Sequence, residues 1–281
     1  MTPFIHTVCG TQFEPSEAPP ARCPVCADER QYETDQDPQW VAPAELASSH
    51  WNTVREIAPG RLGIGIAPEF AIGQRAVLLL RPGGNVLWDC VPLLDPALVR
   101  LAEAAGGVSA IAISHPHYYS AMVDWSRAFG DVPVYLHQAD RAWVMRPDPA
   151  VRFWSGERHA LADDLTLVRC GGHFPGATVL HDAAERTLYS GDVIQVVPDT
   201  RWVSFMYSYP NLVPLSAEAV GRVVASVEGL AFDRIVGAFW DRVVAEDAQA
   251  RLRASAERYV RALRGDWPPA EPDCSLIAPA R

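Results

Sequence analysis

A histidine pair that directly follows an apolar run most constrains what this chain can fold into. Residues 108–113 (Val-Ser-Ala-Ile-Ala-Ile) predict a buried strand, and the segment Ser-His-Pro-His-Tyr-Tyr-Ser follows with His115 and His117. Side chains two residues apart point to the same side of extended backbone, and the proline between the histidines favours extended geometry at the first of them. Both imidazoles are therefore expected to face one metal ion. Neither a carboxylate nor a third histidine comes next, because Tyr119 and Ser120 hold those positions.

The apolar pattern along the rest of the chain predicts short strands first and then strands mixed with helices. Asp95 is the expected N-cap of a helix that begins at Pro96 and ends at Gly106 and Gly107. The other expected elements are strands at 55–58, 62–66, 76–80, 85–89, 132–136, 165–170, 177–182, 187–190 and 234–238, and helices at 122–129, 139–145, 216–230 and 244–264. This order predicts an α/β (α+β) fold with sheets covered by helices on their outer faces.

Three further features accompany the histidine pair. His173 lies in a glycine-rich loop, Cys-Gly-Gly-His-Phe-Pro-Gly, between two expected strands. Asp192 follows another strand in the sequence Tyr-Ser-Gly-Asp. A later strand ends in the aromatic residues Phe239 and Trp240.

In this order and at these separations, the features resemble the metallo-β-lactamase superfamily. The resemblance implies a four-layer αββα sandwich. It aligns His115, His117 and His173 with the histidines of the family's first metal site, and Asp192 with the aspartate that normally bridges two metals.

The chain departs from the family pattern at the second metal site. The family's first motif is His-x-His-x-Asp-His, but Tyr119 stands where its aspartate would be and Ser120 where its last histidine would be. An aromatic residue, Phe239 or Trp240, replaces the late histidine. These three losses together predict a degenerate site that holds one metal ion.

Three imidazoles around a divalent ion with an open position form a known catalytic zinc arrangement. Zinc is favoured at this site, while iron and manganese remain alternatives because such ligands discriminate weakly among these metals. Asp192 is expected to act as a fourth ligand or as a general base. Tyr118 and Tyr119 are expected to donate hydrogen bonds to a developing oxyanion.

A densely aromatic segment follows the Gly-Asp turn. It supports two interpretations: a loop that covers the core, or a wall or lid of a substrate pocket. The residues assigned to the pocket are Trp202, Phe205, Tyr207, Tyr209 and Trp240.

The N-terminal region contains a second set of metal ligands. Two residues separate His6 from Cys9, and two separate Cys23 from Cys26; this spacing resembles the paired knuckles of the zinc-ribbon and rubredoxin-like family. A histidine ligand favours zinc over an iron centre of four thiolates. The expected role is a structural zinc site in a small lobe.

These features divide the chain into a metal knuckle at 1–36, a linker at 37–50, the sandwich domain at 51–268 and a tail at 269–281. The formal net charge of −10 makes nucleic acid an unfavoured partner. No apolar stretch reaches the ~20 residues that span a bilayer, and the clustered cysteines suit a metal site in a reducing compartment, so a cytoplasmic protein without a membrane partner is expected. The sequence leaves assembly into a homo-oligomer open.

The sequence supports two main functional interpretations. The first is a metal-dependent hydrolase of a small ester, thioester or lactone, similar to the thioesterases and lactonases of the superfamily. The second is a binding or regulatory protein, a pseudoenzyme that retains metal for structure only. The net acidity and the missing second metal site disfavour a third interpretation, a nuclease that processes RNA.

Overall fold

Two β-sheets packed face to face form the body of the computed structural model, which describes residues 1–35 and 39–266. Within this described part, the first sheet contains β3 (Trp51–Ala58), β4 (Arg61–Ala67), β5 (Ala76–Leu79), β6 (Val86–Trp88), β7 (Ala110–Ala112), β8 (Val134–His137) and β9 (Val151–Trp154), in that order. The second sheet contains β10 (Arg158–Ala162), β11 (Leu165–Arg169), β12 (Thr178–Asp182), β13 (Thr187–Gly191), β18 (Arg234–Gly237) and β19 (Val243–Val244). The expected tail at 269–281 lies outside the described residues.

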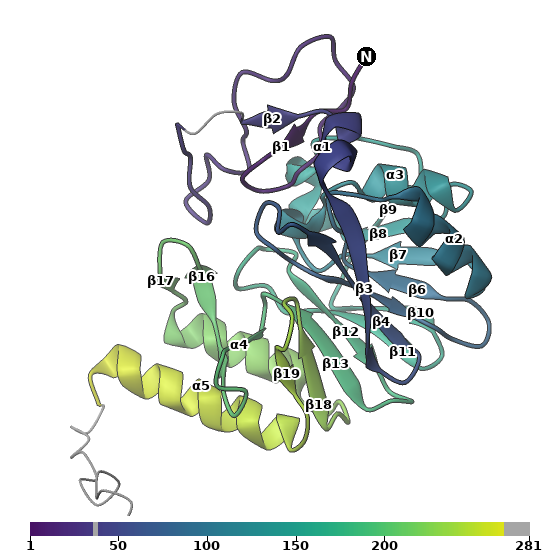
Figure 1. The fold of residues 1–281 in the computed structure, drawn as a ribbon. Coiled ribbons are helices and arrows are strands. Elements are labelled where there is room, and N and C mark those ends of the chain that lie inside the picture. The colour runs from purple at the N-terminus through teal and green to yellow at the C-terminus, as the bar shows by residue number, and fades with distance from the viewer. Residues whose placement is uncertain (36–38, 267–281) are drawn as a thin grey trace, which may run out of the picture.

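Helices cover the outer face of each sheet (Figure 1). They are α2 (Pro96–Ala104) and α3 (Met122–Ala128) on the first sheet, and α4 (Ala217–Val227) and α5 (Ala248–Arg264) on the second. Apolar side chains fill the space between each sheet and its helices, and a third cluster that includes Leu79, Trp88 and Leu180 lies between the two sheets. The predicted four-layer αββα sandwich is therefore confirmed.

The local signals around α2 act as expected. The Asp95 carboxylate accepts a hydrogen bond from the main-chain N–H of Leu98 at 2.8 Å, and Pro96 is the first residue of the helix. No helix in the described part of the chain is both long and apolar enough to cross a membrane.

Several expected elements were wrong in type or extent. Residues 139–145 were expected to be an α-helix, but they contribute to the 3-10 helix η2 (Gln138–Trp143), because the His137 side chain accepts from the N–H of Ala139 and tightens the turn. The last helix begins at Ala248 instead of 244, since Val244 pairs in β19 with the neighbouring strand. The aromatic segment forms two small hairpins, β14 (Gln195–Val196) with β15 (Val203–Ser204) and β16 (Met206–Ser208) with β17 (Val213–Pro214).

A small N-terminal lobe consists of β1 (Ile5–His6), β2 (Trp40–Val41) and the loops between these two paired strands. The helix α1 (Pro43–Ser49) then leads into β3. Thus β2 and α1 occupy most of the segment expected to be a linker, while its residues 37 and 38 lie outside the described part. The main-chain N–H of Gln12 donates to the carbonyl of Ser120 at 3.3 Å, so the lobe contacts the loop that carries the histidine pair (Figure 1).

Candidate metal centre

Four predicted ligands converge where strands of both sheets end. His115 follows β7, His117 lies in the 3-10 helix η1 (Pro116–Tyr118), His173 lies between β11 and β12, and Asp192 follows β13. The four donor atoms all lie within 4.8 Å of one another, and all four side chains are buried. We call these residues the histidine group.

The two histidines of the pair reach the group by different backbone geometry. His115 is extended, with φ −169° and ψ 171°, as expected for the residue before Pro116. His117 lies inside η1, so the expectation of extended backbone through both histidines was wrong for the second. The turn still brings the rings together, with centroids 5.2 Å apart.

Hydrogen bonds fix which ring nitrogen faces the centre of the group. The Nδ1 atom of His173 lies 3.2 Å from the carbonyl of Met206 and 2.9 Å from that of Tyr207, so Nδ1–H donates and Nε2 is left as the metal-binding atom. The Nδ1 atom of His115 lies 2.9 Å from the Ser114 hydroxyl, while its Nε2 lies 3.6 Å from the Asp192 carboxylate.

The unpaired atoms of the group fit a divalent cation. Among the described residues, His115 Nε2 and Asp192 Oδ1 are buried and have no hydrogen-bond partner, and a buried polar atom without a partner is costly. The ring nitrogens His117 Nδ1 and His173 Nε2 lie 3.3 Å apart, as two ligands of one ion could. Burial lowers the pKa of each histidine, to about 4 for His173, which favours the neutral imidazole that ligates metal. Burial raises the pKa of Asp192 to about 6, and nearby polar groups of Tyr118 and Gln195 act in the opposite direction.

A glycine before Asp192 allows the two sheets to approach at the group. Gly191 has φ +52°, and a Cβ atom there would lie 2.6 Å from the Oγ atom of Ser114. Ser114 is itself held by a bond from its N–H to Asp89 at 2.8 Å. Only glycine fits this position without displacing the residue that supports His115.

The residues at and next to the positions where the superfamily has second-metal ligands lie in different surroundings. The Tyr118 ring lies 4.4 Å from the His115 ring, and burial followed by the negative charge of Asp192 raises the pKa of its hydroxyl well above the ordinary value. Tyr119 is buried in the apolar cluster between the first sheet and its helices, where burial, and then the negative charge of Asp140, raises the pKa of its hydroxyl well above the ordinary value. The hydroxyl of Ser120 accepts a hydrogen bond from Gln74 at 3.0 Å.

A model of the metallo-beta-lactamase superfamily matches residues 71–266. The chain belongs to this superfamily. It is 42% identical over 269 residues to the uncharacterized protein YmaE of Bacillus subtilis strain 168, and the match covers 94% of this chain and 97% of YmaE. A match of that extent includes most of the first 70 residues, so the similarity reaches beyond the superfamily's common domain into the N-terminal lobe.

Two solved structures share the fold. The metallo-beta-lactamase FIM-1 from Pseudomonas aeruginosa in its mono-zinc form matches with a TM-score of 0.56 at 14% identity, over 74% of this chain and 95% of FIM-1. The chemotaxis sensor ODP, in a peroxy diiron state, matches with a TM-score of 0.53 at 17% identity, over 74% of this chain and 94% of ODP.

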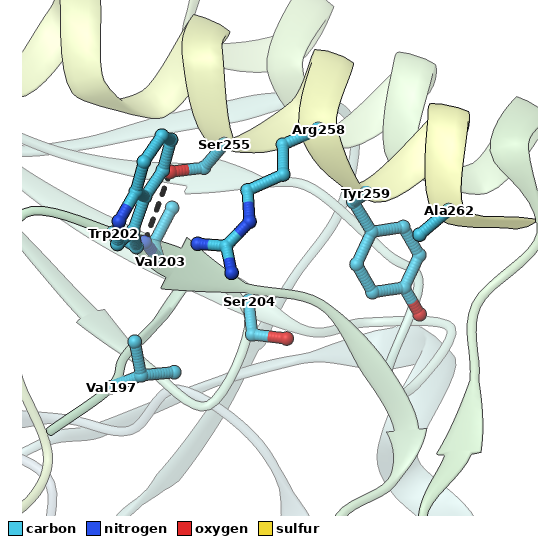
Figure 2. Close-up of a pocket in the computed structure, with 8 residues that line it drawn as sticks. All are labelled: Val197, Trp202, Val203, Ser204, Ser255, Arg258, Tyr259 and Ala262. Atoms are coloured by element: carbon cyan, nitrogen blue, oxygen red, sulfur yellow. Dashed lines mark hydrogen bonds between the residues drawn. The ribbon is translucent and has the colours of Figure 1, made fainter. Parts of the chain in front are cut away.

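Two of the aromatic residues predicted to form a pocket contact the histidine group. The Tyr209 hydroxyl donates to the main-chain carbonyl of Asp192 at 2.8 Å, and the carbonyl of Tyr207 accepts from His173. Phe205 is fully buried against α5. Trp202 instead lines a separate cavity of about 460 Å³ between β15 and α5, where Arg258 lies over its ring at 4.4 Å (Figure 2).

Trp240 lies over β4, where Gly63 and Gly65 leave room for its ring. A Cβ atom on either glycine would lie within 2.9 Å of the indole. Trp240 also lines a cavity of about 400 Å³, together with Glu69, Gly73, Gln195, Val196, Val197, Pro198, Phe239 and Arg242. Gln195 lines this cavity and is also one of the polar groups that act on the pKa of Asp192. It was not predicted from sequence, because a glutamine three residues after an aspartate has no distinctive signature.

The N-terminal ligands also form a compact buried set, which we call the cysteine group: His6, Cys9, Cys23 and Cys26. The Nδ1 atom of His6 lies 3.6 Å from Cys9 Sγ and 3.3 Å from Cys26 Sγ, and the Sγ atoms of Cys9 and Cys23 are 3.7 Å apart. Burial raises the pKa of Cys9 to about 12, which makes its thiolate form unfavourable in the absence of a cation. A bound metal ion would stabilise thiolates that lie this close together. The donor set therefore fits a closed four-ligand zinc site.

Proposed function

We propose that the chain is a hydrolase that uses one divalent ion, with zinc favoured over iron or manganese, to cleave a small ester, thioester or lactone. The observation that carries this proposal is the histidine group: three imidazole nitrogens and a carboxylate, buried within 4.8 Å of one another. A bound ion would polarise the substrate carbonyl and lower the pKa of water toward neutrality. Membership of a superfamily that is typically hydrolytic supports the same reaction class.

The chain's own residues have separate roles in this proposal. Asp192 is the proposed fourth ligand or general base, because its carboxylate lies 3.6 Å from His115 Nε2 and a cation held beside it would favour the ionised form at neutral pH. The Tyr118 hydroxyl keeps its proton, because its pKa is raised well above its ordinary value, and it can donate to an anion that forms nearby. Tyr119 takes no part in the proposed chemistry.

The cavity beside Trp240 and Gln195 is the proposed substrate site. Its volume of about 400 Å³ lies at the low end of the range for small-molecule pockets and supports a small substrate. Phe239 and Trp240 offer apolar contact there, while Glu69 and Arg242 provide polar groups of opposite charge.

The burial of the metal ligands favours the second candidate function, a binding protein without turnover. Asp192 is 5% exposed and the three histidines are at most 2% exposed, so a substrate needs a path that a structural metal does not need. Both candidates require metal at the histidine group, and they differ only in whether hydrolysis follows.

Metal analysis tests the shared part of the proposal. The wild-type protein should hold two metal ions per chain, one at each group of ligands. His115→Ala/His117→Ala should lose one ion. The control His181→Ala should keep both, because His181 is equally a buried histidine but belongs to neither ligand group and hydrogen-bonds to the carbonyl of Ala231. Full metal content in the His115/His117 variant would exclude the assignment of the site.

Hydrolysis of simple aryl esters and thioesters separates the two candidates. The metal-loaded wild-type protein should turn over at least one of these compounds, and His173→Ala should abolish turnover while His181→Ala retains it. Absence of turnover across the panel, with both ions bound, would favour the binding protein. Turnover that survives His173→Ala would exclude hydrolysis at the histidine group.

A further inference from the structure

Arg30 is the residue of the N-terminal lobe that lies beside the histidine group. It lies four residues after Cys26, and only 9% of its surface is exposed. Its guanidinium lies over the Phe174 ring at 3.9 Å from the ring centre, and its Nη1 atom donates to the carbonyl of His173 at 3.3 Å. Arg30 therefore contacts one metal ligand directly and also the residue that follows it.

The same segment also holds the opposite side of His173. The Nδ1–H of His173 donates to carbonyls of β16, and the Ser208 hydroxyl at the end of β16 donates to the carbonyl of Arg30 at 3.2 Å. Just beyond, the Asn211 amide donates to the carbonyls of Glu29 and Gln31 at 2.9 and 2.8 Å. The His173 loop and the strand that orients its imidazole are thus both fastened to residues 29–31.

The charge of Arg30 is partly neutralised within the lobe. Asp28 binds the guanidinium through two hydrogen bonds, at 2.6 and 2.9 Å. Asp28 therefore offsets part of the positive charge that Arg30 brings near the histidine group, a charge that contributes, after burial, to the lowered pKa of the three histidines. The action of Arg30 on His173 comes from the hydrogen bond and the stacking contact, both of which depend on where the lobe places it.

We propose that Arg30 is a positioning residue for His173, and that it couples the cysteine group to the histidine group. A metal ion held by Cys23 and Cys26 fixes the chain that leads to Arg30, and Arg30 fixes the third imidazole of the other group. Metal binding at the cysteine group then raises metal affinity at the histidine group. This inference rests on the proposed metal site, but not on the identity of the substrate.

Cobalt(II) titration of the full-length, metal-free chain tests the coupling. Cobalt bound by thiolates gives an intense charge-transfer absorption, while cobalt bound by imidazoles gives only weaker visible bands, so the two groups titrate separately. Arg30→Gln should weaken cobalt binding at the histidine group by about 10- to 100-fold, as expected when a residue that orients a metal ligand is lost. The thiolate absorption should titrate as in the wild type, which also shows that the lobe is folded.

Arg22→Gln is the matched control. Arg22 belongs to the same lobe and also forms a two-pronged ion pair with an acid, Glu33, but the pair is exposed. The Arg22→Gln variant should bind cobalt at both groups with the same affinity as the wild type. A role for Arg30 in stability alone would lower the unfolding midpoint of Arg30→Gln without changing its cobalt affinity, and that outcome would overturn the proposal.

Cys23→Ser/Cys26→Ser tests the second half of the coupling. It should weaken cobalt binding at the histidine group by a factor similar to that of Arg30→Gln, and adding Arg30→Gln should weaken it little further, because both changes remove one pathway. Wild-type affinity at the histidine group in either variant would overturn the coupling while leaving the proposed function intact. Failure of the wild type itself to bind cobalt at that group would instead overturn the proposed function.

Discussion

Replacing Gly191 with alanine should destabilise the fold more than the same substitution at a glycine with open space around it. Gly191 has φ +52°, and the added Cβ would lie 2.6 Å from Oγ and 2.8 Å from Cβ of Ser114. Ser114 cannot move aside freely, because it is buried and its N–H is bonded to Asp89. The substitution therefore combines backbone strain with overpacking.

The two effects can be given separate magnitudes. An L-residue in the left-handed region costs about 1–2 kcal/mol, and overpacking a core costs about 1–3 kcal/mol. Gly191→Ala should thus lower the free energy of unfolding by roughly 2–5 kcal/mol, which is a large part of the ~5–15 kcal/mol that stabilises a typical domain. Any loss of metal affinity through Ser114 and His115 adds to this cost.

Two other glycines separate the contributions. Gly130 has φ +86° with open space around it, so Gly130→Ala should show only the backbone cost. Gly221 lies on the exposed side of α4 with ordinary φ and open space, so Gly221→Ala should stabilise the protein by up to about 1 kcal/mol. Urea unfolding of all three variants at one fixed zinc concentration, compared through midpoints at constant slope, gives the values. Equal losses for Gly191→Ala and Gly130→Ala would refute the packing argument.

Two further predictions concern buried charges. Arg61→Met should lower the free energy of unfolding by about 1.5–3 kcal/mol, because it removes a 3.0 Å charged hydrogen bond from the fully buried Asp182, which keeps Arg81 as a second partner at 3.3 Å. Arg186→Met breaks an exposed pair with Asp233 and should leave stability nearly unchanged. Similar losses for the two variants in urea unfolding would contradict this. Burial raises the pKa of Asp140 from its ordinary value of 3.8 to about 6, so the folded state binds this proton more tightly, and the carboxyl's contribution to stability is greatest below pH 4 and falls as the pH rises to 6. The free energy of unfolding of Asp140→Asn should therefore rise relative to that of the wild type as the pH increases from 4 to 6. A difference in unfolding free energy that stays constant over this pH range would refute the assignment.

The four residues of the histidine group could be predicted from sequence because each lies in a local motif and the motifs together resemble those of the superfamily. His115 and His117 follow an apolar strand, His173 stands among glycines, and Asp192 follows a strand that ends in glycine. Such local motifs can be recognised in a sequence without knowledge of the tertiary structure. The order of strands and helices could be predicted from the apolar pattern, and the four-layer sandwich from the resemblance to the superfamily.

The positions of Tyr118 and Tyr119 could not be separated from sequence. The two residues are adjacent and chemically identical, and their directions depend on the 3-10 turn that begins at Pro116. That turn places Tyr118 against His115 and sends Tyr119 into the apolar cluster beside α3. An assumption of extended backbone gives no basis for this difference.

The contacts of Arg30 were also beyond sequence reasoning. An arginine four residues after a cysteine carries no signal of a partner near residue 173, because the contact depends on how the lobe docks on the sandwich. The same limit applies to η2, where a side-chain acceptor on His137 favours a 3-10 turn in a segment whose composition also suits an α-helix.

The division of the histidine group between the two sheets makes the metal a reporter of assembly. Residues up to β9 supply His115 and His117, and residues from β10 onward supply His173 and Asp192. The exposed turn between Trp154 and Arg158 is thus a natural point at which to divide the chain into two fragments. Neither fragment alone carries more than two of the four donors. Tight metal binding at this group would therefore show that the two fragments have associated into the native sandwich.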